Sequence, residues 1–144
     1  MKNITNRRDF VKAGSTLSAG AFLASPYIAQ AAQDDKVIKI GLVGIGGRGS
    51  GAAAQAMNAD PNVALTAIGD LFEDRIKLRS RILKARGRDK YQVTEETTFV
   101  GFDSYKKVID SGVDVVILTT PPAFRPQHLE YAISKGVHCF FEKP

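Results

Sequence analysis

The sequence predicts an α/β domain in which helices cover both faces of a parallel sheet, a doubly wound arrangement with the strand order 3-2-1-4-5. Two observations indicate this fold. Short apolar runs rich in β-branched residues alternate with segments of helical periodicity from Lys36 onward. A glycine-rich turn follows the first apolar run, and polar residues follow most of the later ones. At 144 residues the chain has room for one ordinary domain core.

The first strand and its turn form the segment Lys36 to Gly51, KVIKIGLVGIGGRGSG. The apolar run that begins at Val37 is typical of a strand buried on both faces of a parallel sheet. Gly44, Gly46 and Gly49 follow in G-x-G-x-x-G spacing, and Ser50 to Met57 is typical of a helix start. A helix N-terminus at such a turn binds phosphate, so the segment predicts a dinucleotide site. A glycine-rich turn without a ligand is the alternative.

The second strand is expected from Val63 to Ile68, and Asp70 follows it 21 residues after Gly49. An acidic residue at this point accepts hydrogen bonds from an adenosine ribose, and its charge repels a 2′-phosphate. The prediction is therefore NAD, with NADP left open. The alternative is that Asp70 caps the next helix.

That helix is expected from Phe72 to Arg86, with Gly87 closing it. Eight basic residues lie between positions 75 and 90, against one acidic residue, Asp89. They are interpreted as a solvated helix face; the alternative is that Arg75 stacks near the adenine or admits a 2′-phosphate.

Three further strands complete the pattern. Thr97 to Val100 precedes a brief helix that Asp103 or Ser104 caps, and Val113 to Thr119 ends at Thr120-Pro121-Pro122. A helix from Pro126 to Lys135, closed by Gly136, leads to the fifth strand, Val137 to Phe141, and then to Glu142-Lys143-Pro144. Ligands of such sheets bind beyond the carboxyl ends of the strands, where the residues named above gather.

These motifs resemble the N-terminal Rossmann domain of the glucose-fructose oxidoreductase, inositol dehydrogenase and MocA family. The residues that carry the resemblance are the turn Gly44 to Gly49, Asp70, Thr120-Pro121 and Glu142-Lys143-Pro144. The resemblance implies a cofactor site that includes Gly44, Gly46, Gly47, Arg48, Gly49, Asp70, Thr120, Pro121 and Glu142. It also implies a catalytic role for Lys143, whose amine would take the proton of a substrate hydroxyl as hydride leaves carbon.

The resemblance leaves two histidines without a role. Six residues separate Pro121 from His128, more than is usual in the family, so His128 is interpreted as part of the helix. His138 is expected to be a core or edge histidine of the fifth strand. Neither histidine has a further ligand at metal-binding spacing, so no metal site is predicted.

The function expected from this resemblance is that of the NAD(P)-binding domain of an oxidoreductase acting on a sugar, polyol or related hydroxyl compound. Family members continue into a second domain that binds substrate and forms the oligomer interface, so the chain is expected to be a fragment, with homo-oligomers only if that domain is present. An NAD-dependent glycoside hydrolase of the same fold is one alternative. A non-enzymatic dinucleotide-binding module is the other.

The N-terminal 31 residues predict a twin-arginine signal peptide rather than part of the domain. Arg7-Arg8-Asp9-Phe10 begins it, a moderately apolar stretch follows, and Ala29-Gln30-Ala31 forms a small-x-small cleavage site. A mature domain of residues 32–144 in the periplasm or outside the cell is expected, with no membrane contact after cleavage.

Charge and cysteine content exclude other classes of partner. The net charge is +5, of which residues 1–31 carry +3, leaving +2 for the remainder. This is too little to indicate nucleic acid as the principal partner. The single cysteine, Cys139, excludes an internal disulfide and is expected to be a small buried side chain.

Overall fold

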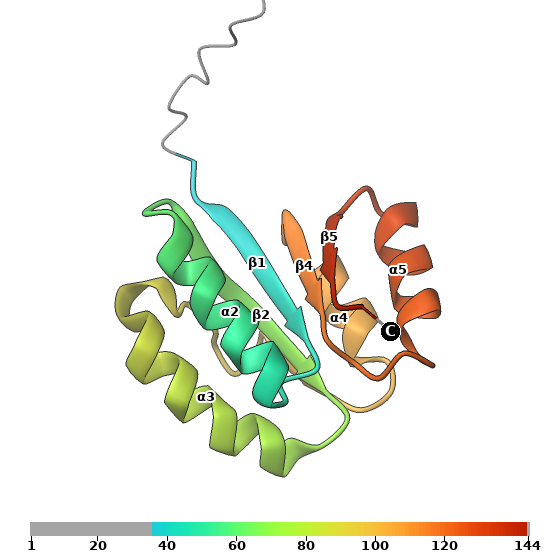
Figure 1. Cartoon of the computed structure of the whole chain (residues 1–144), viewed down its shortest axis with the longest axis horizontal. Helices are drawn as coiled ribbons and strands as arrows, with labels where there is room; N and C mark the ends of the chain where they lie inside the picture. The colour runs from blue at the N-terminus through green and yellow to red at the C-terminus, as the bar shows by residue number, and fades with distance from the viewer. Residues whose placement is uncertain (1–35, 144) are drawn as a thin grey trace, which may run out of the picture. The chain divides into compact units, whose positions relative to one another are not determined.

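A computed structural model describes residues 36–143, so the signal-peptide motif and Pro144 lie outside the described residues. The chain forms a parallel five-stranded sheet with the order β3-β2-β1-β4-β5, which confirms the predicted topology (Figure 1). Its strands are β1 (Ile38–Val43), β2 (Val63–Asp70), β3 (Thr98–Val100), β4 (Val115–Leu118) and β5 (His138–Phe141). Its helices are α2 (Gly47–Ala59), α3 (Glu73–Gly87), α4 (Ser104–Asp110), α5 (Arg125–Ser134) and the short 3-10 helix η1 (Arg88–Lys90).

The helices cover the two faces of the sheet in pairs. In Figure 1, α2 and α3 lie in front of the sheet and α4 lies behind it. The core on the first face packs Met57 of α2 and Leu83 of α3 against Leu42 and Leu65 of the strands. The second core packs Val108 of α4 and Ala132 of α5 against the strands. Burial on both faces explains why β2 and β4 are almost continuously apolar.

Alanines of α2 allow the helix to lie close to the sheet. Ala52, Ala53 and Ala54 are all buried there. The close packing carries the N-terminus of α2 to the carboxyl end of β1, which is where the glycine-rich turn was predicted to hold a phosphate.

Two local predictions, on the burial of residues 37 and 38 and on the cap of α4, were wrong. Val37 and Ile38 are exposed rather than buried, because the pairing of β1 with β4 begins only at Ile40. Neither Asp103 nor Ser104 caps α4 through its side chain: the N-cap residue Asp103 makes no cap bond, and its carboxylate pairs with Lys106 at 3.0 Å.

The end of α3 also differs from the expected glycine cap. Gly87 has a right-handed backbone, and Arg88 is the residue with positive φ, at 49°. A Cβ at position 87 would lie 2.6 Å from the sulfur of Met57, so a larger residue there would require the Met57 side chain to shift. Gly87 of α3 therefore packs directly against Met57 of α2.

No helix in residues 36–143 is long and apolar enough to cross a membrane.

Candidate functional site

A cleft of about 790 Å³ lies at the carboxyl ends of β1, β2, β4 and β5. Most of the predicted site residues line it: Gly44, Gly46, Arg48, Asp70, Thr120, Pro121, Glu142 and Lys143. Gly47 is exposed on the first turn of α2, and Gly49 is buried. Segments up to 94 residues apart in the chain therefore meet at one edge of the sheet.

Each of the three positions of the motif favours glycine for a different structural reason. Gly44 has φ +91°, a conformation that side chains disfavour, and lets the chain turn sharply after β1. Gly49 lets α2 approach that turn, because a Cβ at this position would lie 2.0 Å from the Gly44 carbonyl oxygen. A Cβ at Gly46 would meet no atom within 4 Å. The space at Gly46 opens into the cleft, and a ligand backbone can approach the chain there.

The N-terminus of α2 fits a phosphate group. Gly46 is the N-cap residue and provides no side-chain cap. The N–H groups of the first turn, at Gly47, Arg48 and Gly49, have no acceptor within the helix, since intrahelical bonding starts at Ser50 N–H donating to Gly46 at 2.9 Å. These donors and the positive end of the helix dipole suit the pyrophosphate of a dinucleotide.

Asp70 ties the end of β2 to the glycine turn. It is 7% exposed, and its carboxylate accepts hydrogen bonds from Ile45 N–H at 2.8 Å and from Phe72 N–H at 3.0 Å. It does not cap α3, whose N-cap is Phe72. Each carboxylate oxygen keeps a second lone pair that can accept a ribose hydroxyl at the cleft wall.

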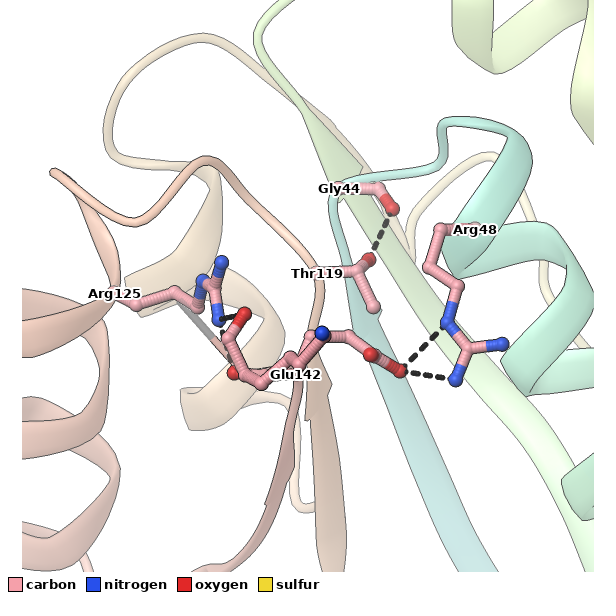
Figure 2. A network of polar contacts seen from close by, with 6 residues as sticks. Gly44, Arg48, Thr119, Arg125 and Glu142 are labelled. Carbon is pink, nitrogen blue, oxygen red and sulfur yellow. Dashed lines mark hydrogen bonds and ion pairs between the residues drawn. The ribbon is translucent and has the colours of Figure 1, made fainter.

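Thr119 is a site residue that the sequence analysis missed. Its hydroxyl donates to the Gly44 carbonyl at 2.6 Å (Figure 2). Thr119 N–H donates to the Val43 carbonyl at 2.9 Å. The side chain therefore fastens the glycine turn to the end of β4. In the sequence, the only feature that could have indicated this role is the position of Thr119 at the end of an apolar strand.

An ion pair crosses from α2 to the end of β5. The Arg48 guanidinium donates from Nε to Glu142 Oε1 at 2.7 Å, and its Nη2 lies 2.5 Å from the same oxygen (Figure 2). Arg125 reaches Glu142 from the other side and donates to its carbonyl oxygen. Both Arg48 and Glu142 were predicted site residues, but their pairing was not predicted, and Arg125 was missed.

His128 lies in the cleft wall, although the sequence analysis assigned it no role. It is 6% exposed, stacks on Tyr105 with ring centroids 4.1 Å apart, and has Nδ1 3.2 Å from the Thr120 hydroxyl. Burial lowers the pKa of His128 below its usual 6.5, so the ring is neutral at pH 7. Its position in α5 agrees with the predicted helix.

The remaining candidates are His138, Cys139 and Arg75. His138 is exposed on the edge strand β5, as expected of an edge histidine. Cys139 is half-buried on the edge strand rather than buried as expected, and this partial burial raises the pKa of its thiol. Arg75 lines the cleft, with its guanidinium 4.8 Å from the Phe72 ring centroid. Among residues 36–143, no group of three or more His, Cys, Asp or Glu side chains is arranged to hold a metal ion.

Comparison with known proteins gives a family match over nearly all of the described residues. Residues 38–144 match the GFO_IDH_MocA family, described as an oxidoreductase family with an NAD-binding Rossmann fold. A glycosyl hydrolase family 109 protein of Porphyromonas gingivalis is 27% identical over 111 residues, which are 76% of this chain and 22% of that protein.

Solved structures share the fold. Scyllo-inositol dehydrogenase of Lactobacillus casei, solved with NAD(H) and scyllo-inositol, is 25% identical with a TM-score of 0.59, over 76% of this chain and 28% of that one. Myo-inositol dehydrogenase of the same organism is 16% identical with a TM-score of 0.61, over 75% and 29%. The chain thus spans less than a third of these relatives.

Proposed function

Because the chain belongs to the GFO_IDH_MocA oxidoreductase family, we propose that residues 36–143 are the NAD-binding domain of an enzyme that oxidises a hydroxyl group of a sugar, polyol or related compound. The observation that carries the proposal is the open space at Gly46 beside the uncapped N-terminus of α2. NAD, when bound, supplies the hydride acceptor.

The cofactor would lie along the carboxyl edge of the sheet. The N–H groups of Gly47, Arg48 and Gly49 would hold the pyrophosphate, and Asp70 would accept from the adenosine ribose. The carboxylate of Asp70 disfavours a 2′-phosphate, so NAD is preferred to NADP. Thr120 and Pro121 would lie beside the nicotinamide.

Lys143 and Glu142 would face the reacting end of the cofactor. Lys143 lines the cleft and is exposed, so its amine can reach a substrate hydroxyl and take its proton. Glu142 would contact the nicotinamide ribose. These roles rest on the match of Glu142-Lys143-Pro144 to the family motif.

Binding of NAD⁺ to the chain, measured by calorimetry, tests the proposal. We expect micromolar to millimolar binding that Gly46→Val abolishes, since the valine fills the space of the pyrophosphate. Gly51→Val is the matched control, because a Cβ at Gly51 also meets no atom within 4 Å but lies farther along α2. Absence of binding to the wild-type chain, or equal binding by both variants, would refute the cofactor role.

A second candidate is an NAD-dependent glycoside hydrolase, favoured by the similarity to the family 109 protein. The role that the family resemblance implies for Lys143, taking the proton of a substrate hydroxyl as hydride leaves, favours the oxidoreductase instead. Incubation of a longer natural protein containing this domain with an aryl glycoside and with free polyols separates the two activities. Cofactor binding without either activity would indicate a non-enzymatic module.

We further propose that the protein is exported by the twin-arginine route, because Arg7-Arg8-Asp9-Phe10 precedes an apolar stretch and a small-x-small site. Arg7→Lys together with Arg8→Lys should retain the precursor in the cytoplasm in a fractionation experiment. Normal export of this variant would contradict the proposal.

A further inference from the structure

Arg125 joins the ends of β4 and β5 through one guanidinium group. It is the first residue of α5 and is half-buried. Its Nη1 donates to the Glu142 carbonyl (Figure 2). Its Nε donates to the Thr120 carbonyl at 2.8 Å, and its Nη1 also donates to the Lys143 carbonyl at 2.8 Å. One side chain therefore holds the main chain of two segments at the cleft.

The backbone itself does little to hold these segments. The last main-chain hydrogen bond between them in the described chain is Glu142 N–H to Leu118, at a long 3.4 Å. Two prolines follow Thr120 and have no N–H to donate. Beyond Leu118 and Glu142, side-chain hydrogen bonds take the place of main-chain hydrogen bonds between the two segments. Arg125 donates three of them.

The charge of Arg125 is not neutralised in residues 36–143. The acceptors of Arg125 are main-chain carbonyls, and no carboxylate of the described chain forms a salt bridge with it. Arg48 differs, since it pairs with the Glu142 carboxylate. Glu142 is thus held at two points, its carbonyl by Arg125 and its side chain by Arg48.

We propose that Arg125 is a positioning residue that fixes the main chain of Glu142 and Lys143 against the end of β4 and so presents both side chains to the cleft. What these side chains then do rests on the proposed function. Lysine cannot replace arginine here, because a single ammonium group lacks the planar fork that reaches the carbonyls of Thr120, Glu142 and Lys143 together.

The test compares Arg125→Lys with Arg81→Lys, the same change on the exposed face of α3. Backbone amide NMR of the chain without cofactor reports the order of residues 142 and 143 directly. We expect Arg125→Lys to shift both amides and to lower their heteronuclear NOE relative to those of β4, while Arg81→Lys changes neither. In a folded Arg125→Lys chain, a loss of order spread evenly over the domain, with no excess at residues 142 and 143, would mean a merely structural role and would overturn the proposal.

The affinity for NAD⁺ provides the second measurement. We expect the Kd of Arg125→Lys to rise roughly tenfold, because ordering of the two residues must then accompany binding. Unchanged order at residues 142 and 143, or an unchanged Kd, would overturn the role of Arg125. If the wild-type chain fails to bind NAD⁺, the proposed function falls, and the NMR comparison still decides the positioning role.

A second variant covers the case in which Arg125→Lys does not fold. Arg125→Gln retains a donor near Thr120 but cannot reach Glu142 and Lys143. It should disorder residues 142 and 143 selectively. A folded Arg125→Gln chain with a wild-type spectrum at these two residues would refute the proposal.

Discussion

Replacement of Gly49 by alanine tests the close approach of α2 to the glycine turn. A Cβ at this position would lie 2.0 Å from the Gly44 carbonyl oxygen and 2.5 Å from the Thr119 hydroxyl oxygen. Ordinary contacts begin near 3.4 Å, so the helix must move away from the turn by more than about 1 Å. The atom that it meets first belongs to the backbone, which cannot rotate aside.

The expected cost follows from two opposing effects. Overpacking of a tight site costs roughly 1–3 kcal/mol, occasionally more. Replacement of a helical glycine by alanine gains roughly 0.5–1 kcal/mol. With a backbone clash at Gly49, we expect a net loss of about 2 kcal/mol, or a fall of about 10 °C in the melting temperature. The added Cβ would also displace the Thr119 hydroxyl, so the Thr119–Gly44 hydrogen bond should weaken.

Gly51→Ala is the matched control on the same helix. A Cβ there meets nothing within 4 Å, so only the gain in helix propensity remains and the variant should be more stable than wild type by about 0.5–1 kcal/mol. Urea unfolding followed by circular dichroism measures both variants. Equal stability of Gly49→Ala and wild type, or the same change in both variants, would refute the packing argument.

Three further changes test other contacts. Thr119→Val should cost about 1–2 kcal/mol, because the Gly44 carbonyl loses its 2.6 Å donor; thermal unfolding measures this, and Thr119→Ser should restore most of it. His128 binds a proton more readily in the unfolded chain than in the folded chain, because burial lowers its folded pKa below the unfolded value of 6.5. The free energy of unfolding should therefore decrease as pH falls below 6.5. Unfolding by urea between pH 7.5 and 5.5 should show this slope, and His128→Gln should reduce it. Lys90→Met should cost about 1–2 kcal/mol in the same assay, because the ammonium donates to the Met57 and Asp60 carbonyls at the end of α2, both at 2.7 Å; an unchanged free energy would contradict that capping role.

Much of the fold was predictable because its signals are local. The apolar runs of β1, β2 and β4 are buried in the structure over most of their length, and the strand order follows from right-handed crossovers between parallel strands. The spacing of Gly44, Gly46 and Gly49 predicted a turn and a helix start, and the structure has both. Errors at the helix ends concern caps, because side-chain capping depends on partners that sequence spacing does not determine. The error at Val37 and Ile38 concerns burial, because β4 pairs with β1 only from Ile40 onward.

Contacts within the site were harder to predict. Thr119 and Gly44 are 75 residues apart, and Arg48 and Glu142 are 94 apart. His128 looked like an ordinary helical residue, and only the packing of α5 beside Tyr105 places it in the cleft wall. No sequence motif indicated the role of Arg125. Its three acceptors are main-chain carbonyls, which every residue has, so the identity of the acceptor residues gives no signal.

The amino-acid sequence by itself determined the alternation of strands and helices, the glycine-rich turn and the residues that end each strand. These features depend on hydrophobic periodicity and on backbone preferences, which act over a few neighbouring residues. Only the tertiary structure decided that Thr119 fastens the turn, that Asp70 bonds to Ile45, and that Arg48 and Arg125 hold Glu142 from two sides. Hydrogen bonds and ion pairs form within about 3 Å, and only packing of the whole sheet brings such distant residues that close.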